Sequence, residues 1–200
     1  MRRNTRERWG SVSIALHWTV ALLILLVQVP VGLSLDAFGP GTTQNVLYFV
    51  HKNVGVLILV LAVIRLGWRW SNPVPLLPAD LPSWQAALAR ITHYLLYILL
   101  FVMPLSGFLF TAMGGYPVPL LGLYDLARLV PENKPLSDVM HGVHVTGQWV
   151  LYATALLHVA GALQHHFIRR DGVLRRMLSS TVPLPFIDKA AHAARCSNVR

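Results

Sequence analysis

Four long apolar stretches alternate along the chain with shorter segments that are rich in proline, glycine and polar residues. The apolar stretches cover residues 12–35, 46–68, about 86–112 and about 139–168. A helix needs about 20 mostly apolar residues to cross the hydrocarbon core of a bilayer, so each stretch is long enough to span a membrane. The segments between them contain proline and glycine clusters, which end helices. The pattern therefore predicts an all-α fold, an integral membrane four-helix bundle.

Acidic residues are absent from all four stretches. The eight acids lie in the connecting segments or near the termini: Glu7, Asp36, Asp80, Asp125, Glu132, Asp138, Asp171 and Asp188. This is the distribution expected when a carboxylate inside a bilayer is costly. Only 12% of the residues are charged and 54% are hydrophobic. A soluble domain carries about a quarter charged residues, so the composition favours a membrane protein and excludes a disordered chain.

Basic residues are distributed unequally between the two predicted sides of the membrane. The chain has 17 lysines and arginines against eight acids, a net charge of +9. With four spans, both termini and the segment between the second and third spans share one side, which carries 14 basic and four acidic residues. The other side carries three basic and four acidic residues. The positive-inside rule places both termini in the cytoplasm. The positive charge thus reflects topology, and no nucleic-acid partner is expected.

Histidines are the most unusual residues within the spans. Eight lie in a span or at its edge: His17, His51, His93, His141, His144, His158, His165 and His166. Histidines at similar depths in the membrane form two predicted pairs. His17 and His158 lie toward the cytoplasmic side, and His51 and His144 lie toward the outer side. His144 and His158 are 14 residues apart, which is about 21 Å along a helix and places them on one helix face.

Two stacked haem groups would account for this arrangement, each bound between two imidazoles from different helices. The only cysteine is Cys196, and no C-x-x-C-H motif is present, so any haem is held without a thioether bond. The alternative for each histidine is an interhelical hydrogen bond. A metal transporter is disfavoured because the spans contain no carboxylates.

Several segments together resemble the bacterial cytochrome b561 family, over roughly residues 8–180. They are "ALHWTV", "VHKNVGVLILVLAVIRLGWRW", "HYLLYILLFVMPLSGFLF", "HVTGQWVLYATALLH" and "QHHFIRRDGVLRRML". The resemblance implies a four-helix protein of the bacterial inner membrane that binds two haem b groups and exchanges electrons with quinone. The family's iron ligands correspond to His17, His51, His144 and His158. We expect residues 1–180 to form this domain and 181–200 to form a cytoplasmic tail.

Further residues compete for roles at the haem groups. His141 is the alternative to His144, but it lies about 100° from the face of His158. Lys52 and Arg65 are cations in an otherwise uncharged helix, so they are candidates to bind haem propionates. The alternative for both is snorkelling to lipid phosphate.

Three more histidines are less clearly assigned. His165 lies within about 20° of the helical phase of His158 and is a candidate partner of a haem propionate or a quinone carbonyl. Its alternative is a place at the headgroup interface, which is the favoured interpretation for His166. His93 lies in a span that provides no haem ligand, where either a quinone pocket or an interhelical hydrogen bond explains it.

Two functions follow from this interpretation. The first is electron transfer between a periplasmic-side donor and membrane quinone, with ubiquinone as the redox partner that the resemblance implies. Iron with two histidine ligands has no open position, which favours outer-sphere transfer. Some family members oxidise superoxide, but the negative outer side weakens that assignment here. The second function is a cytochrome b anchor subunit, whose outer loop at residues 114–138 docks a partner oxidoreductase.

Overall fold

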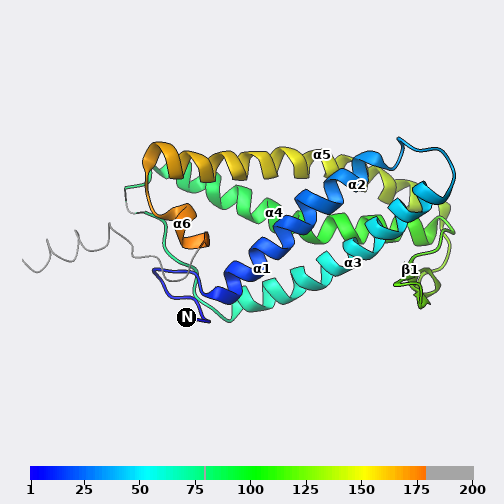
Figure 1. Ribbon diagram of the computed structural model, residues 1–200, viewed down its shortest axis with the longest axis horizontal. Coiled ribbons are helices and arrows are strands. Elements are labelled where there is room, and N and C mark those ends of the chain that lie inside the picture. Colours follow the sequence, from blue (N-terminus) through cyan, green and yellow to red (C-terminus); the bar gives the residue numbers. More distant parts are fainter. Residues whose placement is uncertain (79, 179–200) are drawn as a thin grey trace, which may run out of the picture.

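The computed structural model describes residues 1–78 and 80–178, which form an antiparallel bundle of four long helical segments (Figure 1). The first segment runs through α1 (Ser11–Leu22), a π-helical stretch η1 (Leu23–Gln28) and α2 (Val29–Ser34). The other three are α3 (Thr42–Trp70), α4 (Ser83–Met113) and α5 (Lys134–Gln164). The predicted four-helix bundle is confirmed.

The predicted spans match these helices closely, but two details differ. The first span contains a π-helical turn rather than a continuous α-helix. In the described part of the chain, three segments are long and apolar enough to cross a membrane, namely Ser11–Ser34, α3 and α4. The fourth helix, α5, is as long as α4, with 31 residues, but it is less apolar. It carries three histidines and three glycines, together with Gln148.

Helix boundaries follow from local sequence signals. The α5 helix begins after Asn133, whose side chain accepts a hydrogen bond from the backbone N–H of Leu136 at 3.1 Å, as an N-cap residue does. The α4 helix ends before Gly114 and Gly115, and Gly115 adopts a φ of +81°, which favours glycine. Beyond α5 the chain continues as a π-helix, η3 (His165–Arg169), before the short helix α6 (Val173–Leu178).

The helices pack in chain order around a small apolar core. The closely packed neighbours are α1 with α3, α3 with α4, and α4 with α5. Val20, Ile58, Ala62 and Leu100 form the buried cluster at the centre. The outward faces remain apolar, with exposed leucines such as Leu26 and Leu156. Apolar side chains on these outer faces are suited to contact with lipid tails.

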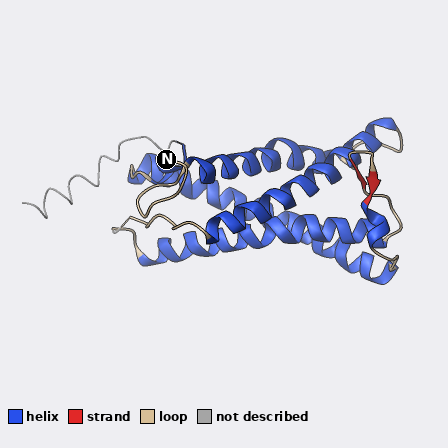
Figure 2. Cartoon of the chain, turned by 90° about the horizontal axis from the view of Figure 1, so that it is seen from below, coloured by secondary structure: helices blue, strands red, loops and turns tan. Residues whose placement is uncertain are grey.

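The two ends of the bundle differ in structure. At one end lie the N-terminal residues and α6, where the indole N–H of Trp18 donates to the carbonyl of Met177 at 2.7 Å. At the other end a β-hairpin of β1 (Pro119–Leu120) and β2 (Tyr124–Asp125) is followed by a 3₁₀-helix, η2 (Leu126–Leu129) (Figure 2). We call these the N-terminal end and the hairpin end.

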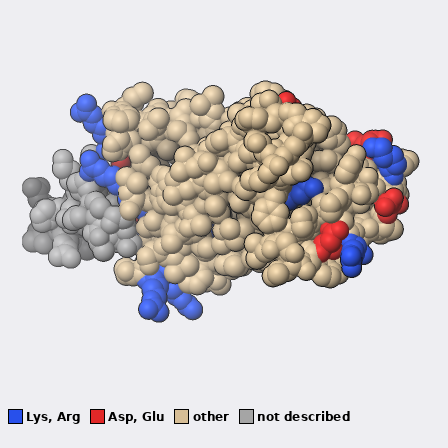
Figure 3. Space-filling view, turned by 45° about the vertical axis from the view of Figure 1, so that its right-hand side comes forward, with Lys and Arg blue, Asp and Glu red and all other residues tan. Residues whose placement is uncertain are grey.

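The two ends also differ in charge. On the face drawn in Figure 3, lysines and arginines predominate around the N-terminal end. At the hairpin end, acidic and basic side chains lie next to one another. This distribution agrees with the unequal charges of the two predicted sides.

Candidate functional site

Two pairs of histidines face each other inside the bundle, one toward each end. His17 of α1 and His158 of α5 have ring centroids 6.1 Å apart, with ring planes inclined by 70°. His51 of α3 and His144 of α5 have ring centroids 6.2 Å apart and planes inclined by 82°. All four side chains are half-buried. The structure thus brings together the same pairs that sequence depth predicts.

The hairpin-end pair is supported mainly by α4. The Nδ1 of His144 donates to the backbone carbonyl of Met103 at 2.9 Å, and the hydroxyl of Ser106 lies 3.3 Å from the same nitrogen. Metal-binding histidines commonly donate their second ring nitrogen to a carbonyl in this way. The bond leaves Nε2 of His144 free for another ligand.

Glycines make room for the rings of this pair. A Cβ atom on Gly107 would lie 2.8 Å from Cε1 of His144, and one on Gly32 would lie 3.5 Å from Cε1 of His51. Real side-chain atoms do not approach as closely as 2.8 Å, so only glycine fits at position 107 with this ring orientation. His141 is exposed and lies against Phe110, 5.2 Å between ring centroids, rather than against His51.

The pair at the N-terminal end is part of a larger cationic and aromatic cluster. Arg65 donates to Nδ1 of His17 at 3.0 Å and to the hydroxyl of Tyr97 at 3.2 Å. Its guanidinium lies 5.3 Å from the centroid of the Tyr97 ring, and the guanidinium of Arg69 lies 5.2 Å from it. Such contacts are favourable cation–π interactions. Arg65, which the sequence indicates as a candidate to bind a haem propionate, thus lies against this pair.

His93 joins the same cluster from α4. Its ring centroid is 5.2 Å from that of His158, with an edge-to-face inclination of 66°. This ring contact joins α4 to α5, but no hydrogen bond of His93 is found within the described residues, and the residue is exposed. Both explanations that the sequence offers for His93 therefore stay predictions.

The geometry of both pairs fits a haem group. An imidazole nitrogen lies about 2 Å from a bound metal ion, and the ring centre lies about 1 Å farther, so two imidazoles on opposite sides of one iron have centres about 6 Å apart. The observed separations of 6.1 and 6.2 Å agree with this value. Within the described residues, α5 is not closely packed against α1 or α3, the helices that supply its partners. In residues 1–78 and 80–178 there is no cluster of three or more His, Cys, Asp or Glu side chains that could hold a metal ion by itself.

Lys52 lies at the hairpin end, where it binds the loop at residues 114–138. Its Nζ donates to the backbone carbonyl of Pro117 at 2.7 Å and lies 5.8 Å from the ring centroid of Tyr48. The neighbouring Asn53 bonds to the backbone of Pro119 and Leu121. Both side chains therefore fasten the β-hairpin to α3.

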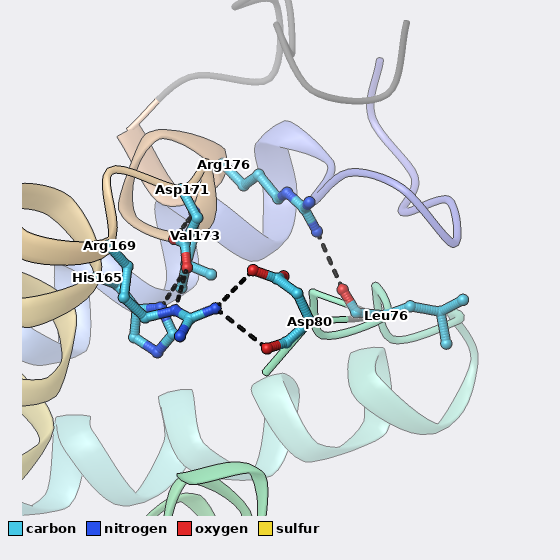
Figure 4. Close-up of polar contacts among 7 residues, drawn as sticks. All are labelled: Leu76, Asp80, His165, Arg169, Asp171, Val173 and Arg176. Carbon is cyan, nitrogen blue, oxygen red and sulfur yellow. Dashed lines mark hydrogen bonds and ion pairs between the residues drawn. The ribbon is translucent and has the colours of Figure 1, made fainter. Parts of the chain in front are cut away.

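His165 lies in an ion-pair network at the N-terminal end, beyond the last turn of α5 (Figure 4). Its Nδ1 is 2.6 Å from a carboxylate oxygen of Asp171, which also accepts from Nε of Arg169 at 3.4 Å. Arg169 reaches across to the carboxylate of Asp80 at 2.8 Å. The same view shows Arg176 donating to the carbonyl of Leu76 at 3.0 Å. These bonds join η3 and α6 to the segment between α3 and α4.

Sequence reasoning missed several residues that adjoin the histidine pairs. Gln28, Met103, Ser106 and Gly107 lie against His51 or His144, and Tyr97 binds Arg65, the partner of His17. One signal was available for Gln28, because it is the only amide side chain within residues 12–35. Met103 acts through its backbone, which no side-chain pattern reveals.

Comparison with known proteins gives consistent matches over most of the chain. A family model described as prokaryotic cytochrome b561 matches residues 8–180. Cytochrome b561 homolog 2 of Escherichia coli (strain K12) is 31% identical over 180 residues, which cover 89% of this chain and 95% of that protein. Cytochrome b561 homolog 1 of the same organism is 29% identical over 86% of this chain and 97% of its own length. A protein named probable superoxide oxidase CybB, from Yersinia pestis, is 26% identical over 86% of this chain and 96% of its own length.

Proposed function

The chain belongs to the prokaryotic cytochrome b561 family, and from this membership and the two histidine pairs we propose that it carries electrons between two haem b groups stacked across the membrane. Family membership makes it a bacterial membrane-bound b-type cytochrome of electron transfer. The proposal adds the number of haem groups and their ligands. His17 and His158 would bind one haem, and His51 and His144 the other.

The single observation that carries this proposal is the equal separation of the two pairs, 6.1 and 6.2 Å between ring centroids. Each pair offers two imidazoles from different helices, and these two side chains would hold one haem iron between them. A bound haem supplies a one-electron carrier that has no open iron position. The protein positions the rings and surrounds them with apolar side chains, which limits access of water.

Arg65 has a specific role in this proposal. A guanidinium can only donate hydrogen bonds, so in its contact with Arg65 the Nδ1 of His17 acts as an acceptor. An imidazole that binds iron through Nε2 carries its proton on Nδ1. In the protein with haem bound, Arg65 would therefore donate to an anion instead, and a haem propionate would accept this hydrogen bond. Lys52 would serve the other haem in the same way, exchanging the carbonyl of Pro117 for a propionate.

We place the N-terminal end of the bundle in the cytoplasm and the hairpin end on the periplasmic side of the inner membrane. The support is the positive-inside rule, since 14 of the 17 basic residues belong to the side with both termini. Residues 1–180 would form the electron-transfer domain. The predicted tail at residues 181–200 lies outside the described residues.

The proposed reaction runs from a one-electron donor on the periplasmic side to membrane quinone, with ubiquinone as the acceptor. Reduction of one quinone to quinol takes two electrons and two protons, so two donor molecules are oxidised for each quinol formed. Superoxide is a donor to be tested, because a relative is named a probable superoxide oxidase. The hairpin end offers little attraction for an anion, since Lys134 is paired with Asp138 at 2.8 Å and Figure 3 shows acidic side chains beside basic ones at this end.

A second function is favoured by the exposed apolar tip of the hairpin. Leu121, Leu123 and Leu129 are each at least 66% exposed at this end. Apolar patches of this kind are typical of surfaces that contact a partner or a membrane. In this alternative the chain is a cytochrome b anchor subunit, and the outer loop at residues 114–138 docks a periplasmic oxidoreductase.

The deciding experiment is a reduced-minus-oxidised optical spectrum of the purified protein, combined with a haem-to-protein ratio. We expect two haem b groups per chain, and one group in each of the variants His51→Ala and His17→Ala. The matched control is His141→Ala, which should retain both. A ratio of one or less in the unaltered protein, or loss of both groups from either single variant, would contradict the proposal. A periplasmic enzyme recovered in equal amount with the protein would favour the anchor function.

A further inference from the structure

Gln28 is a polar side chain that contacts the backbone of His51, a predicted haem ligand. It ends the π-helical stretch η1, and its Nε2 donates to the backbone carbonyl of His51 at 3.2 Å. Polar side chains at membrane depth are costly, and π-helical turns inside α-helices occur frequently at functional sites. Both features indicate that Gln28 has a functional role.

Two buried atoms at this contact have no hydrogen-bond partner among the described residues. One is Oε1 of Gln28, and the other is Nδ1 of His51. An amide oxygen can only accept a hydrogen bond, and the Nδ1 of an imidazole that binds a metal through Nε2 can only donate one. The two unpaired atoms are therefore chemically complementary. They belong to residues that the bond from Nε2 of Gln28 already joins.

Glycines lie on both sides of this contact. A Cβ atom on Gly32, four residues after Gln28, would lie 3.8 Å from Nδ1 of His51, so the Nδ1 edge of the ring faces the helix that carries Gln28. A Cβ atom on Gly55, one turn after His51, would lie 3.3 Å from Nε2 of Gln28. The backbones of both helices thus come close enough for the amide and the ring to meet.

We propose that Gln28 is the positioning residue of His51, and that its amide oxygen accepts the hydrogen bond from Nδ1–H while Nε2 holds the His51 carbonyl. This inference rests on the proposed function, in which Nε2 of His51 binds iron. It completes a symmetrical arrangement, because His144 already donates its Nδ1–H to the carbonyl of Met103. Each imidazole of the hairpin-end pair then has one carbonyl-type acceptor, from an amide side chain on one side and from the backbone on the other.

This hydrogen bond has a measurable electronic consequence. An acceptor on Nδ1–H makes the imidazole a stronger electron donor to iron and stabilises the oxidised state. Removal of the acceptor should therefore raise the midpoint potential of the haem at the hairpin end. The haem between His17 and His158 should keep its potential, since Gln28 does not contact that pair.

The test is a spectroelectrochemical titration of the purified protein in detergent, compared with the variants Gln28→Met and Gln28→Glu. The wave of the hairpin-end haem is identified as the one that His51→Ala removes. We expect a positive shift of that wave alone in Gln28→Met, and no positive shift in Gln28→Glu, which retains an oxygen acceptor of similar reach. The matched control is Gln44→Met, because Gln44 also joins two helical segments by donating to a carbonyl, that of Leu35 at 3.1 Å.

The outcomes separate this inference from the proposed function. Two haem groups with unchanged potentials in Gln28→Met would overturn the role of Gln28 and leave the proposed function intact. An equal shift in Gln44→Met would overturn it as well. If Gln28→Met loses the hairpin-end haem, retention of that haem in Gln28→Glu supports the inference, and its loss from both variants overturns it. Fewer than two haem groups in the unaltered protein would contradict the proposed function itself.

Discussion

His144 donates its Nδ1–H to the backbone carbonyl of Met103 at 2.9 Å, a bond that joins α5 to α4. The α4 helix supplies neither member of a histidine pair, yet it fixes the orientation of one of the four rings. The hydroxyl of Ser106 approaches the same nitrogen at 3.3 Å. A ring held on one edge in this way has a fixed orientation, and its position becomes sensitive to the adjoining residue Gly107.

Substitution of Gly107 should therefore disturb the hairpin-end pair. In Gly107→Ala the new Cβ would lie 2.8 Å from Cε1 of His144, so the ring has to move away from Met103. Overpacking of this kind costs about 1–3 kcal/mol. We expect the variant to retain one haem group fully and to bind the other weakly, as measured by the haem-to-protein ratio after gel filtration.

Gly142→Ala is the control for this substitution. Gly142 lies on α5 near His144, and no atom lies within 4 Å of the position its Cβ would take. This variant should keep both haem groups. Equal haem content in Gly107→Ala and Gly142→Ala would contradict the assignment of His144 as a ligand whose ring orientation matters.

Arg65 should set the potential of the haem at the N-terminal end. A positive charge near the iron destabilises the oxidised state, because ferric haem carries one more positive charge than ferrous haem. Arg65→Met should therefore lower the midpoint potential of that haem and leave the other unchanged. Arg65→Lys, which keeps the charge, should restore most of the potential, although a lysine cannot bind a propionate through two parallel hydrogen bonds as a guanidinium does.

The appropriate control for Arg65 is Arg69→Met. Arg69 lies against the same Tyr97 ring, at 5.2 Å from its centroid, so it has a similar charge and a similar neighbour. We expect a smaller shift, since Arg65 rather than Arg69 contacts His17 in the structure. A larger shift in Arg69→Met than in Arg65→Met would show that the propionate partner has been assigned to the wrong arginine.

The histidine pairs could be predicted from the sequence because two simple regularities determine them. Depth along an apolar span places His17 with His158 and His51 with His144, and the helical repeat places His144 and His158 on one face. Both regularities survive packing, because the four helices are long and lie side by side. Because the spans contain no carboxylates, the histidines stand out among their few ionisable residues.

The partners of individual side chains could not be predicted, because they depend on how the chain reverses at the helix ends. Arg170 adopts a left-handed conformation at φ +53°, which turns Asp171 back toward His165. The β-hairpin folds onto α3 and places the carbonyl of Pro117 against Lys52. The π-helical stretch before Gln28 changes the helical phase of the residues that follow it, which a 3.6-residue repeat does not describe.

The network around Asp171 should stabilise the N-terminal end of the bundle. Asp171 is only 16% exposed and accepts hydrogen bonds from His165, Arg169 and the backbone N–H of Val173. Hydrogen bonds to a charged group contribute about 1.5–3 kcal/mol, so Asp171→Ala should lower the thermal unfolding temperature measurably. Asp80→Ala removes a partner of the same Arg169, but Asp80 is 79% exposed, and its loss should cost less than about 1 kcal/mol. Equal destabilisation by the two variants would contradict this ranking.

The β-hairpin formed by β1 and β2 should lose protection at low pH through Asp125. The backbone N–H groups of Val118 and Ala127 donate to its carboxylate at 2.7 and 3.0 Å, and these two bonds lower the pKa of Asp125 below its ordinary value of 3.8. A carboxyl group with a lowered folded-state pKa stabilises the fold at pH values above its ordinary pKa. That contribution is lost as the pH falls through the lowered pKa.

Protection of the amides of residues 116–130 should therefore stay constant from pH 7 to 5 and decline below pH 3.8. The variant Asp125→Asn should show reduced protection already at pH 7 and a smaller change with pH. Amide exchange detected by mass spectrometry measures both effects, with a peptide from the middle of α4 as the internal reference. Identical protection of the hairpin in the unaltered protein and in Asp125→Asn at pH 7 would contradict this role of Asp125 and would leave Asn53 as the side chain that holds the hairpin.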